Sequence, residues 1–424
     1  MVGREMDLKE KKPDRILTKK VLEDFSILNR NDDVSEVRRS LDQLACFTQI
    51  EDDAAELISN ESVFDLRDDF LNFSGLKFLS DTASEHIGKI KAAGLDLSGL
   101  ESVSNRSAAN LSRYYGGFIP GHLSLSGLKF LSDAVAERLS RSGASLNLDG
   151  LTSLSDSAAD LLSKSRSSCL SLNGLLYLTD ATAETLAKCG ASLSLDGLTS
   201  ISDAAAASLS KSQGGLSLNG LISLSDFAAE NFFTSPSKYL SLDGLTSLSD
   251  SASESLSKCR AWHLSLNGLK SLSDTTARSL SQCDTGALYL DGLTSLSDAA
   301  AENLSKTKKC HFLSLNGLTD LSGGAAESLV KSKVSVFLNG ITSLSDAAAA
   351  SLSKCRESLW LNGLTSLSDV AAESFSKFSG SQLHLRGLTS LSDSAAESLS
   401  KLIGACFHRS LQIISLQSDA QPNG

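Results

Sequence analysis

Leucines recur along most of the chain in a fixed succession of two patterns, and the copy that begins at Leu240 shows both. Leu240-Ser-Leu242-Asp alternates apolar and polar residues, which predicts a short strand with one buried face. Leu248, Ala252 and Leu256 follow at intervals of four, which predicts one apolar helix face, and the small Ala252 lets the helix lie close to the sheet. Each copy is therefore expected to contribute one strand and one helix.

Polar residues mark the ends of the expected helix in the same copy. Ser249 and Asp250 stand where the helix begins, as an N-cap and a favourable first-turn charge. Lys258 lies in the last turn, four residues after Glu254, a spacing that favours an ion pair. Gly244 is predicted to permit the tight turn that leaves the strand. The same spacing joins Glu184 with Lys188, Glu302 with Lys306 and Glu397 with Lys401, and we interpret these charges as a solvated outer face.

Comparison of the chain with itself shows that this unit is repeated. The template reads Leu-x-Leu-x-Gly-Leu-Thr-Ser-Leu-Ser-Asp-x-Ala-Ala-Glu-Ser-Leu-Ser-Lys, followed by a few variable residues. Fourteen copies occupy residues 71–410, and a period of about 24 residues is typical of a solenoid of stacked units. The copies begin at Leu71, Leu95, Leu123, Leu146, Leu170, Leu193, Leu216, Leu240, Leu264, Leu288, Leu313, Val336, Leu359 and Leu383.

Both ends depart from the template, as the ends of a stack are expected to. Residues 1–41 are rich in charge and are predicted to form a helical N-terminal cap. Residues 42–70 match only the second half of the template and are predicted to be a degenerate first repeat. Residues 411–424 are predicted to add a capping strand and a tail.

The segment Leu193-Ser-Leu195-Asp-Gly197-Leu198-Thr-Ser-Ile201-Ser-Asp203-Ala-Ala resembles a leucine-rich repeat. The resemblance is nearest to the cysteine-containing and ribonuclease-inhibitor-like subclasses and to tandem bacterial members of the family. It implies an α/β solenoid, a curved array with parallel strands on the concave side and helices on the convex side. It implies no chemistry.

Two features depart from the family pattern. Glycine replaces the family's Cys or Asn at the strand exit, so the buried side-chain ladder at that turn is expected to be absent. Cys189, Cys259, Cys283 and Cys355 lie one place short of the family's second cysteine. Cys259 and Cys283 share a template position in adjacent copies and are expected to be neighbours on the rim. We interpret them as free, partly buried thiols, with a redox pair as the alternative.

The fourth template position alternates strictly between aspartate and asparagine over eight copies: Asp149, Asn173, Asp196, Asn219, Asp243, Asn267, Asp291 and Asn316. Adjacent strands lie about 4.8 Å apart, so an unbroken aspartate ladder would stack like charges, and interposed asparagines separate them. Duplication of a two-repeat block, with Asx-Gly used as turn chemistry, explains the alternation equally. Calcium is disfavoured because no dense cluster of oxygen ligands is present.

The second position is serine in most copies, and uniform small polar residues make poor binding hot spots. Departures from the template gather toward the C-terminal half: Tyr239, His263, Tyr289, Phe312, Phe337, Trp360, His384 and Arg386. Phe337, Trp360 and His384 share one template position in successive copies and are predicted to lie side by side. We interpret these eight residues as the candidate partner-binding site; packing over the sheet near the C-terminal cap is the alternative.

An enlarged loop over residues 112–122 carries Tyr114, Tyr115 and Phe118. Loops with aromatic residues often bind partners. Packing of these rings on the neighbouring helix is the alternative interpretation.

Charge and composition narrow the function. The net charge is −11 and no basic block is present, so neither nucleic acid nor an anionic membrane is the expected partner. The chain has no apolar run of 18 residues and its first residues lack the apolar core of a signal peptide. A cytoplasmic protein with reduced thiols is expected, with leaderless export left open.

No catalytic motif is apparent. The six histidines form no His-x-x-x-His pair, and no paired Cys-x-x-Cys, Gly-x-Ser-x-Gly elbow or phosphate-binding glycine loop occurs. We therefore expect no enzyme activity, no cofactor and no metal. The predicted function is a non-enzymatic, monomeric binding module for an unidentified protein partner, acting through the concave face. A structural or spacer solenoid, and carbohydrate or small-ligand binding along the Ser/Asx ladder, remain alternatives.

A core substitution tests the stacking of the repeats. Leu195→Ala should cost about 2 to 5 kcal/mol locally, because stability in a solenoid is a sum of repeat and nearest-neighbour terms. Amide hydrogen exchange of the repeats on either side measures this loss. A small loss spread evenly over one global melting transition would contradict the prediction.

Overall fold

The computed structural model describes residues 16–24, 43–60, 66–116, 120–307 and 309–404. It divides into two compact units, the first comprising Met1–Leu198 with Ser212–Gly214 and the second Thr199–Lys211 with Gly215–Gly424. The predicted capping strand in residues 411–424 and most of the predicted N-terminal cap lie outside the described residues.

The first unit alternates strands and helices from its start. Its strands are β1 Ile16–Leu17, β2 Gln49–Ile50, β3 Phe70–Asn72, β4 Gly94–Asp96, β5 His122–Ser124, β6 Ser145–Asn147, β7 Cys169–Ser171 and β8 Ser192–Ser194. Its helices are α1 Lys19–Asp24, the 3-10 helix η2 Gln43–Cys46, α3 Asp52–Ser59, α4 Asp81–Ile87, α5 Asn105–Leu111, α6 Asp133–Leu139, α7 Asp156–Ser163 and α8 Asp180–Leu186. Strands β1 and β2 form a separate parallel pair.

The second unit continues the same alternation. Its strands are β9 Leu216–Ser217, β10 Tyr239–Ser241, β11 His263–Ser265, β12 Ala287–Tyr289, β13 Phe312–Ser314, β14 Ser335–Phe337, β15 Leu359–Trp360 and β16 Leu383–His384. Its helices are α9 Asp203–Leu209, α10 Asp226–Phe233, α11 Asp250–Ser255, the 3-10 helix η3 Leu256–Lys258, α12 Asp274–Gln282, α13 Asp298–Leu304, α14 Gly323–Leu329, α15 Asp346–Leu352, α16 Asp369–Ser376 and α17 Asp393–Gly404.

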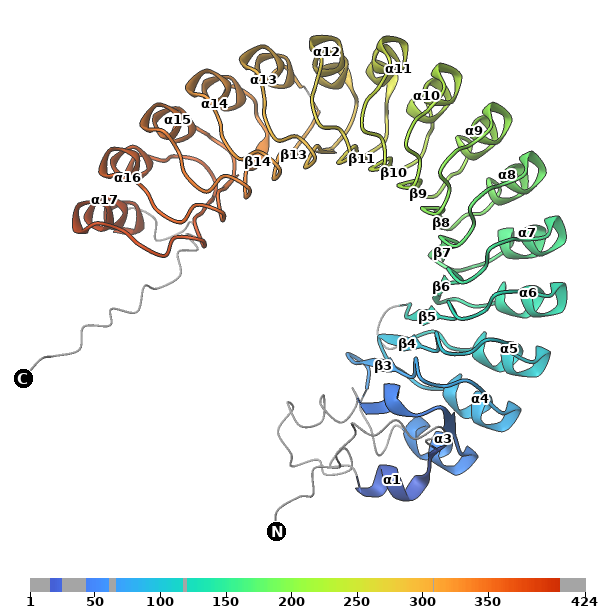
Figure 1. The fold of residues 1–424 in the computed structure, drawn as a ribbon. Helices are drawn as coiled ribbons and strands as arrows, with labels where there is room; N and C mark the ends of the chain where they lie inside the picture. The colour runs from blue at the N-terminus through green and yellow to red at the C-terminus, as the bar shows by residue number, and fades with distance from the viewer. Residues whose placement is uncertain (1–15, 25–42, 61–65, 117–119, 308, 405–424) are drawn as a thin grey trace, which may run out of the picture. The chain divides into compact units, whose positions relative to one another are not determined.

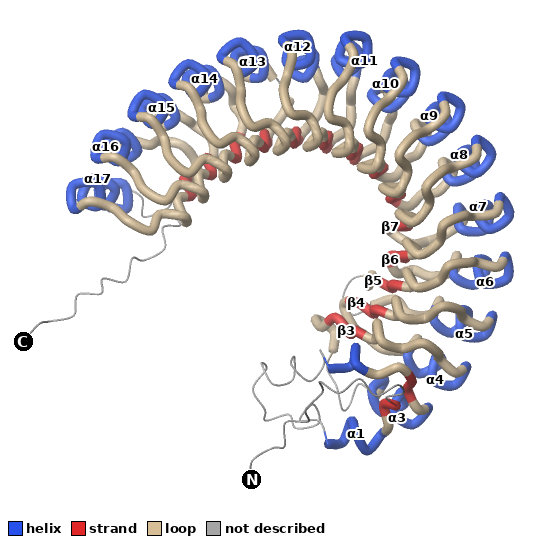
Figure 2. The backbone as a smooth tube through the Cα atoms, in the orientation of Figure 1, coloured by secondary structure: helices blue, strands red, loops and turns tan. Residues whose placement is uncertain are grey.

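Within each unit the strands pair in parallel and in chain order, and the pairing aligns the opening residues of successive copies. In the first unit Leu71 pairs with Leu95, and Leu95 with Leu123. In the second unit Leu240 pairs with Leu264, and the register continues to the Leu359–Leu383 pair. The strands line one side of each unit and the helices the other (Figures 1 and 2). The predicted α/β solenoid, with one strand and one helix for each copy, is confirmed.

The predicted helix starts are confirmed. In α11 the Ser249 hydroxyl accepts a hydrogen bond from the Ala252 N–H at 3.0 Å, and Asp250 occupies the first turn. A serine or threonine cap bond of this kind begins every α-helix from α4 to α16. The Ser249 hydroxyl also donates to Asp226 of the preceding helix at 2.5 Å. The N-cap is therefore also a bond between repeats.

The apolar face of α11 is shorter than predicted. Ala252 and Leu256 are buried, but Leu248 is only partly buried and precedes the helix, whose first residue is Asp250. Of the three apolar residues spaced by four, the first, Leu248, thus lies outside the helix, just before the N-cap residue Ser249.

The predicted ion pair between Glu254 and Lys258 is wrong. Lys258 pairs instead with Glu230 of the preceding repeat, with 2.8 Å between the ammonium and carboxylate groups. The last turn of this helix tightens into the 3-10 helix Leu256–Lys258, which turns Lys258 away from the position directly above Glu254. The three other predicted pairs are present between exposed side chains, Glu184–Lys188, Glu302–Lys306 and Glu397–Lys401.

Glycine at the fifth template position is needed for a reason other than the predicted turn conformation. A Cβ atom on Gly268 would lie 2.2 Å from the carbonyl oxygen of Asp243 and 2.4 Å from that of Leu245. Gly244 is confined in the same way by two carbonyl oxygens of the preceding repeat. Among the described residues only Gly116 has a positive φ, at 106°. The close approach of consecutive turns, and not backbone freedom, therefore demands glycine here.

The cysteine neighbours lie in the core and not on the rim. Cys259 and Cys283 are both buried and free of disulfide bonds. The Cys283 thiol donates to the Leu256 carbonyl at 2.9 Å. Its hydrogen bond with Cys259 and its burial hold the pKa of Cys283 well above the usual value. The described geometry therefore keeps Cys283 as a protonated thiol at neutral pH.

Two glycine substitutions test the role of close approach. Gly268→Ala should destabilise its repeat by about 1 to 3 kcal/mol, because the methyl group forces adjacent turns apart. Gly190→Ala is the matched control, since no atom lies within 4 Å of a Cβ placed there, and it should be neutral or stabilise by about 0.4 to 1 kcal/mol. Denaturant midpoints and local amide exchange measure both. Equal effects of the two substitutions would contradict the explanation.

Candidate binding surface

Aspartate and asparagine at the fourth position join each repeat to the next. Asp243 Oδ1 accepts from the Asn267 N–H at 2.8 Å and from the Ser265 hydroxyl at 2.6 Å. Asn267 Oδ1 accepts in turn from the Asp291 N–H at 2.8 Å. The same backbone bond joins Asp149 to Asn173, Asn173 to Asp196, Asn219 to Asp243, Asp291 to Asn316, Asn316 to Asn339, Asn339 to Asn362 and Asn362 to Arg386. We call this series the Asx ladder.

The glycine position carries no side-chain ladder, but a partly buried ladder stands beside it. The Asx ladder stands one position before the glycine and supplies a side-chain bond between consecutive turns. It runs beside the close contact between turns at Gly268. The same chain geometry thus requires a hydrogen-bonding side chain at the fourth position and no side chain at the fifth.

Asparagine contributes a bond that aspartate cannot make. Asn267 Nδ2 donates to Asp243 Oδ2 at 3.3 Å and to the Ser265 hydroxyl at 2.9 Å. Asn173 makes the equivalent bond back to Asp149 at 3.4 Å. An ionised carboxylate has no proton to donate and would face another carboxylate instead. Alternation of aspartate with asparagine therefore adds hydrogen bonds and avoids repulsion between carboxylates, even if duplication of a two-repeat block produced the pattern.

Most of the ladder's polar atoms are engaged within the protein. Asp243 alone accepts from the Asn267 N–H, from Asn267 Nδ2 and from the Ser265 hydroxyl. Binding a sugar along this surface would require exchange of such bonds for bonds to the ligand, which gains little free energy. The surface residues that differ from the template are consequently the better candidates for contact with a partner.

Three of the predicted site residues form a first aromatic cluster in the second unit. The ring centroids of Tyr239 and His263 lie 4.5 Å apart, and those of His263 and Tyr289 lie 6.1 Å apart. The three rings border a hollow of 230 Å³ that also contacts Ser265 and Asn267. Partial burial lowers the pKa of His263, so its imidazole is neutral at pH 7.

Four others form a second cluster, and the predicted adjacency of Phe337, Trp360 and His384 is confirmed. These residues pair in register on strands β14, β15 and β16. Phe337 and Trp360 stack with centroids 4.0 Å apart and ring planes at 11°, and Trp360 and His384 stack at 4.8 Å and 5°. Phe312 meets Phe337 at 6.4 Å. Because the ring faces contact one another, the stack turns ring edges toward solvent.

Exposure within the second cluster is uneven. Phe312 is 46% exposed, Phe337 and Trp360 are partly buried, and His384 is only 8% exposed. Burial, with a further contribution from the charge of Arg386, lowers the pKa of His384. Arg386 itself is exposed and stands at the end of the Asx ladder. Its guanidinium is therefore the charged group at the edge of an otherwise neutral aromatic surface.

The eight predicted residues do not form one continuous row. In the sheet, Tyr289 stands opposite Ser314, and Phe312 stands opposite Ala287. The small residues at these two positions separate the first cluster from the second. The structure thus brings the candidates together as a group of three and a group of four, with Arg386 beside the latter.

Trp262 was missed by the sequence interpretation, although 55% of its surface is exposed. Its ring lies over Gly286, where a Cβ would approach to 2.8 Å, and reaches His311 with centroids 6.0 Å apart. Comparison of the position two residues before each opening leucine would have found this aromatic–glycine–histidine succession. Phe70, Gly94 and His122 form the same succession in the first unit, but one residue before the opening leucines.

Exposed rings at the eighth template position were also missed. Phe78, Phe130 and Tyr177 are exposed there, in every second copy of the first unit. Most other copies carry serine at this position. The signal was therefore available in the sequence as a departure from the template.

The two described tyrosines of the enlarged loop differ in burial. Tyr114 is buried, and its hydroxyl donates to the Ala92 carbonyl at 2.9 Å, while burial raises its pKa. Tyr115 is 55% exposed. Phe118 lies outside the described residues.

Comparisons with known proteins give only structural matches. No protein-family model matches the chain, and no curated protein matches it. A leucine-rich-repeat protein of Leptospira interrogans aligns with 82% of this chain and 96% of its own, at 16% identity and a TM-score of 0.44. An internalin of Listeria monocytogenes aligns with 89% and 95%, at 16% identity and a TM-score of 0.35. Yeast Rad7, solved in complex with Elc1, aligns with 92% and 97%, at 18% identity and a TM-score of 0.40.

The chain has the leucine-rich-repeat fold. Because these TM-scores are low, the assignment rests on the chain's own features, which are the leucine template, one strand and one helix for each copy, and parallel pairing in register.

Two further observations concern the described part of this leucine-rich-repeat chain. Within it, no group of three or more His, Cys, Asp or Glu side chains is placed to hold a metal ion. Its helices include none with the length and apolar character needed to cross a membrane.

The alternation in the Asx ladder can be tested by paired substitutions. Asn267→Asp should destabilise its repeat by about 1 to 3 kcal/mol at neutral pH, because it removes the Nδ2 donor and places a carboxylate between two others. Asp243→Asn should cost less, since it keeps the acceptor for the next repeat and three successive copies already carry Asn316, Asn339 and Asn362.

Local amide exchange and denaturation at low and high salt measure the difference. Added salt should reduce the cost of Asn267→Asp, because screening weakens repulsion between the carboxylates. Equal costs for the two variants would show that the alternation has no energetic role.

Proposed function

We propose that this leucine-rich-repeat chain is a non-enzymatic binding module that captures a protein partner on the strand face of its second unit. The observation that carries the proposal is the stack of Phe337, Trp360 and His384 on a surface where most copies have serine. Aromatic residues and arginine dominate the energetics of protein interfaces, and Arg386 stands beside this stack.

The aromatic side chains of the stack are already ordered in the absence of a partner. Each ring of Phe337 and Trp360 is held by its neighbours, so little side-chain entropy remains to be lost on binding. The exposed edges of aromatic rings carry partial positive charge, and they favour carbonyl oxygens or the faces of a partner's rings. The surface thus suits a partner segment with aromatic or backbone acceptor groups.

The chemistry of the surface supports binding more directly than the alternatives. A spacer solenoid needs no exposed ring, yet Tyr239 and Phe312 are each about half exposed on the same face. Sugar binding along the Asx ladder would compete with the bonds that already join the repeats. We therefore favour a protein partner that contacts both aromatic clusters.

Restoring the template tests the proposal. In a Phe337→Ser and Trp360→Ser double variant the second position returns to the serine of most copies, and partner affinity should fall at least tenfold, or by about 1.4 kcal/mol or more. The partner is first identified by capture on the full chain with mass spectrometry, and its affinity for each variant is then measured with purified proteins.

A matched control uses equally apolar rings on the other unit. Phe78→Ser and Phe130→Ser remove exposed aromatic residues and also restore the template serine, and they should leave the affinity unchanged. Circular dichroism melts establish that both double variants remain folded. Unchanged affinity in the first variant, or an equal loss in the control, would contradict the proposed surface. Failure of the full chain to capture a partner would favour a spacer over a binding module.

A further inference from the structure

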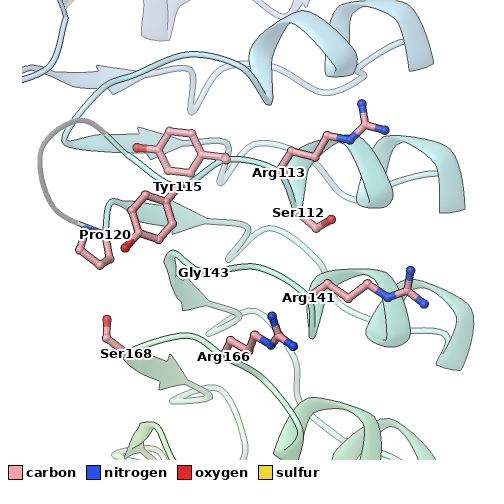
Figure 3. A pocket seen from close by; sticks show the side chains of 9 residues that line it. Ser112, Arg113, Tyr115, Pro120, Arg141, Gly143, Arg166 and Ser168 are labelled. Atoms are coloured by element: carbon pink, nitrogen blue, oxygen red, sulfur yellow. The ribbon is translucent and has the colours of Figure 1, made fainter.

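A pocket of 450 Å³ opens on the first unit, away from the aromatic clusters, where the enlarged loop meets the next two repeats (Figure 3). Arg113, Arg141 and Arg166 all line it, and no acidic residue does. This is an unusual composition in a chain whose net charge is −11. Its volume lies within the range of about 300 to 1,000 Å³ that is typical of ligand pockets.

The arginines are departures from the template. The closing position of each copy is lysine in most of the chain, but arginine in the two adjacent copies that end at Arg113 and Arg141. A basic residue there is ordinarily explained by the C-terminal end of the helix dipole. Lysine serves that purpose equally well, and Arg166 lies two residues beyond the closing Lys164, outside helix α7. The dipole therefore does not explain the choice of arginine or its clustering.

The opposite wall of the pocket is flat and largely apolar. Tyr114 is anchored in the core through its bond to the Ala92 carbonyl, and this holds the adjacent Tyr115 at the surface. A Cβ atom on Gly143 would lie 2.7 Å from the Tyr115 ring, so only glycine admits the ring there. Figure 3 shows Tyr115 and Pro120 on one side of the pocket and the arginine side chains on the other.

Much of the positive charge lacks a close partner. Arg141 pairs with Glu137 at 2.7 Å. Within the described residues, neither Arg113 nor Arg166 forms an ion pair. The charge of Arg113 acts on Glu85, but the direct partner of that carboxylate is Lys89, at 3.0 Å. The described lining thus supplies three exposed guanidinium groups and no carboxylate.

We propose that this pocket binds a small phosphorylated molecule that carries a planar ring, with its phosphates on the arginines and its ring against Tyr115. Guanidinium groups bind phosphate oxygens through paired hydrogen bonds, which explains arginine in place of lysine. Because the three arginines come from three successive repeats, they suit a chain of two or more phosphates better than one. The Tyr115 ring supplies a stacking surface of matching shape.

Calorimetric titration of the full chain at physiological ionic strength tests the proposal, with ADP and inorganic pyrophosphate as probes. Both should bind, and ADP more tightly. Arg141→Gln with Arg166→Gln should weaken both at least tenfold, because it removes two of the three phosphate donors. Tyr115→Ser should weaken ADP and leave pyrophosphate unchanged, because only ADP has a ring.

Lys306→Gln with Lys331→Gln is the matched control, since it makes the same charge change at closing positions of the second unit. This variant should bind both probes like the unaltered chain, and circular dichroism confirms that every variant is folded. Absence of binding at millimolar concentrations, or an equal loss in the lysine control, would overturn the site. Equal affinity for ADP and pyrophosphate that Tyr115→Ser does not change would overturn the assignment of a ring-bearing ligand.

Discussion

The distance between consecutive turns at the strand exit is the constraint on which the rest of each unit depends. At that point the carbonyl oxygens of one repeat lie so near the glycine of the next that no side chain fits between them. This approach brings the fourth-position side chain of one repeat within hydrogen-bonding distance of the next repeat's backbone. At the other end of the repeat, N-cap serines such as Ser249 bond to the preceding helix. Hydrogen bonds from the fourth-position side chains on one side of the leucine core, and from the N-cap serines on the other, thus fix the register of the repeats.

The hydrogen bonds between repeats determine which residues are available to bind another molecule. The serines and Asx residues that dominate the strand face are occupied in holding the stack together. Contact with other molecules is left to residues that interrupt the template, and these interruptions have a different character in the two units. In the second unit they are neutral stacked rings with one exposed arginine. In the first unit they include the three arginines and Tyr115 that line one pocket. One repeated framework can therefore present two chemically distinct surfaces.

Periodicity was sufficient to predict features that depend on position within a copy. The strand and helix of each repeat, the Ser249 cap and the adjacency of Phe337, Trp360 and His384 all follow from alignment of the copies. Features that depend on distances between copies were not accessible in this way. Contacts between adjacent copies explain the need for glycine, the backbone bond from Asn267 to Asp243, 24 residues apart, and the pairing of Lys258 with Glu230, 28 residues apart. Alignment of the copies did not predict the arginine pocket, because Arg166 occupies a different template position from Arg113 and Arg141.

The Asx ladder has a direction, since in each of its described bonds a side-chain oxygen accepts from the backbone of the repeat that follows. Its last acceptor is Asn362, which bonds to the Arg386 N–H. At Arg386 the series meets a side chain that has donors and no acceptor. A further strand added beyond β16, from this chain or from a second molecule, would find no carboxylate or amide oxygen to receive its backbone N–H at this position. The series of side-chain bonds therefore ends at Arg386, and within the described residues the ladder offers no bond to a strand placed beyond β16.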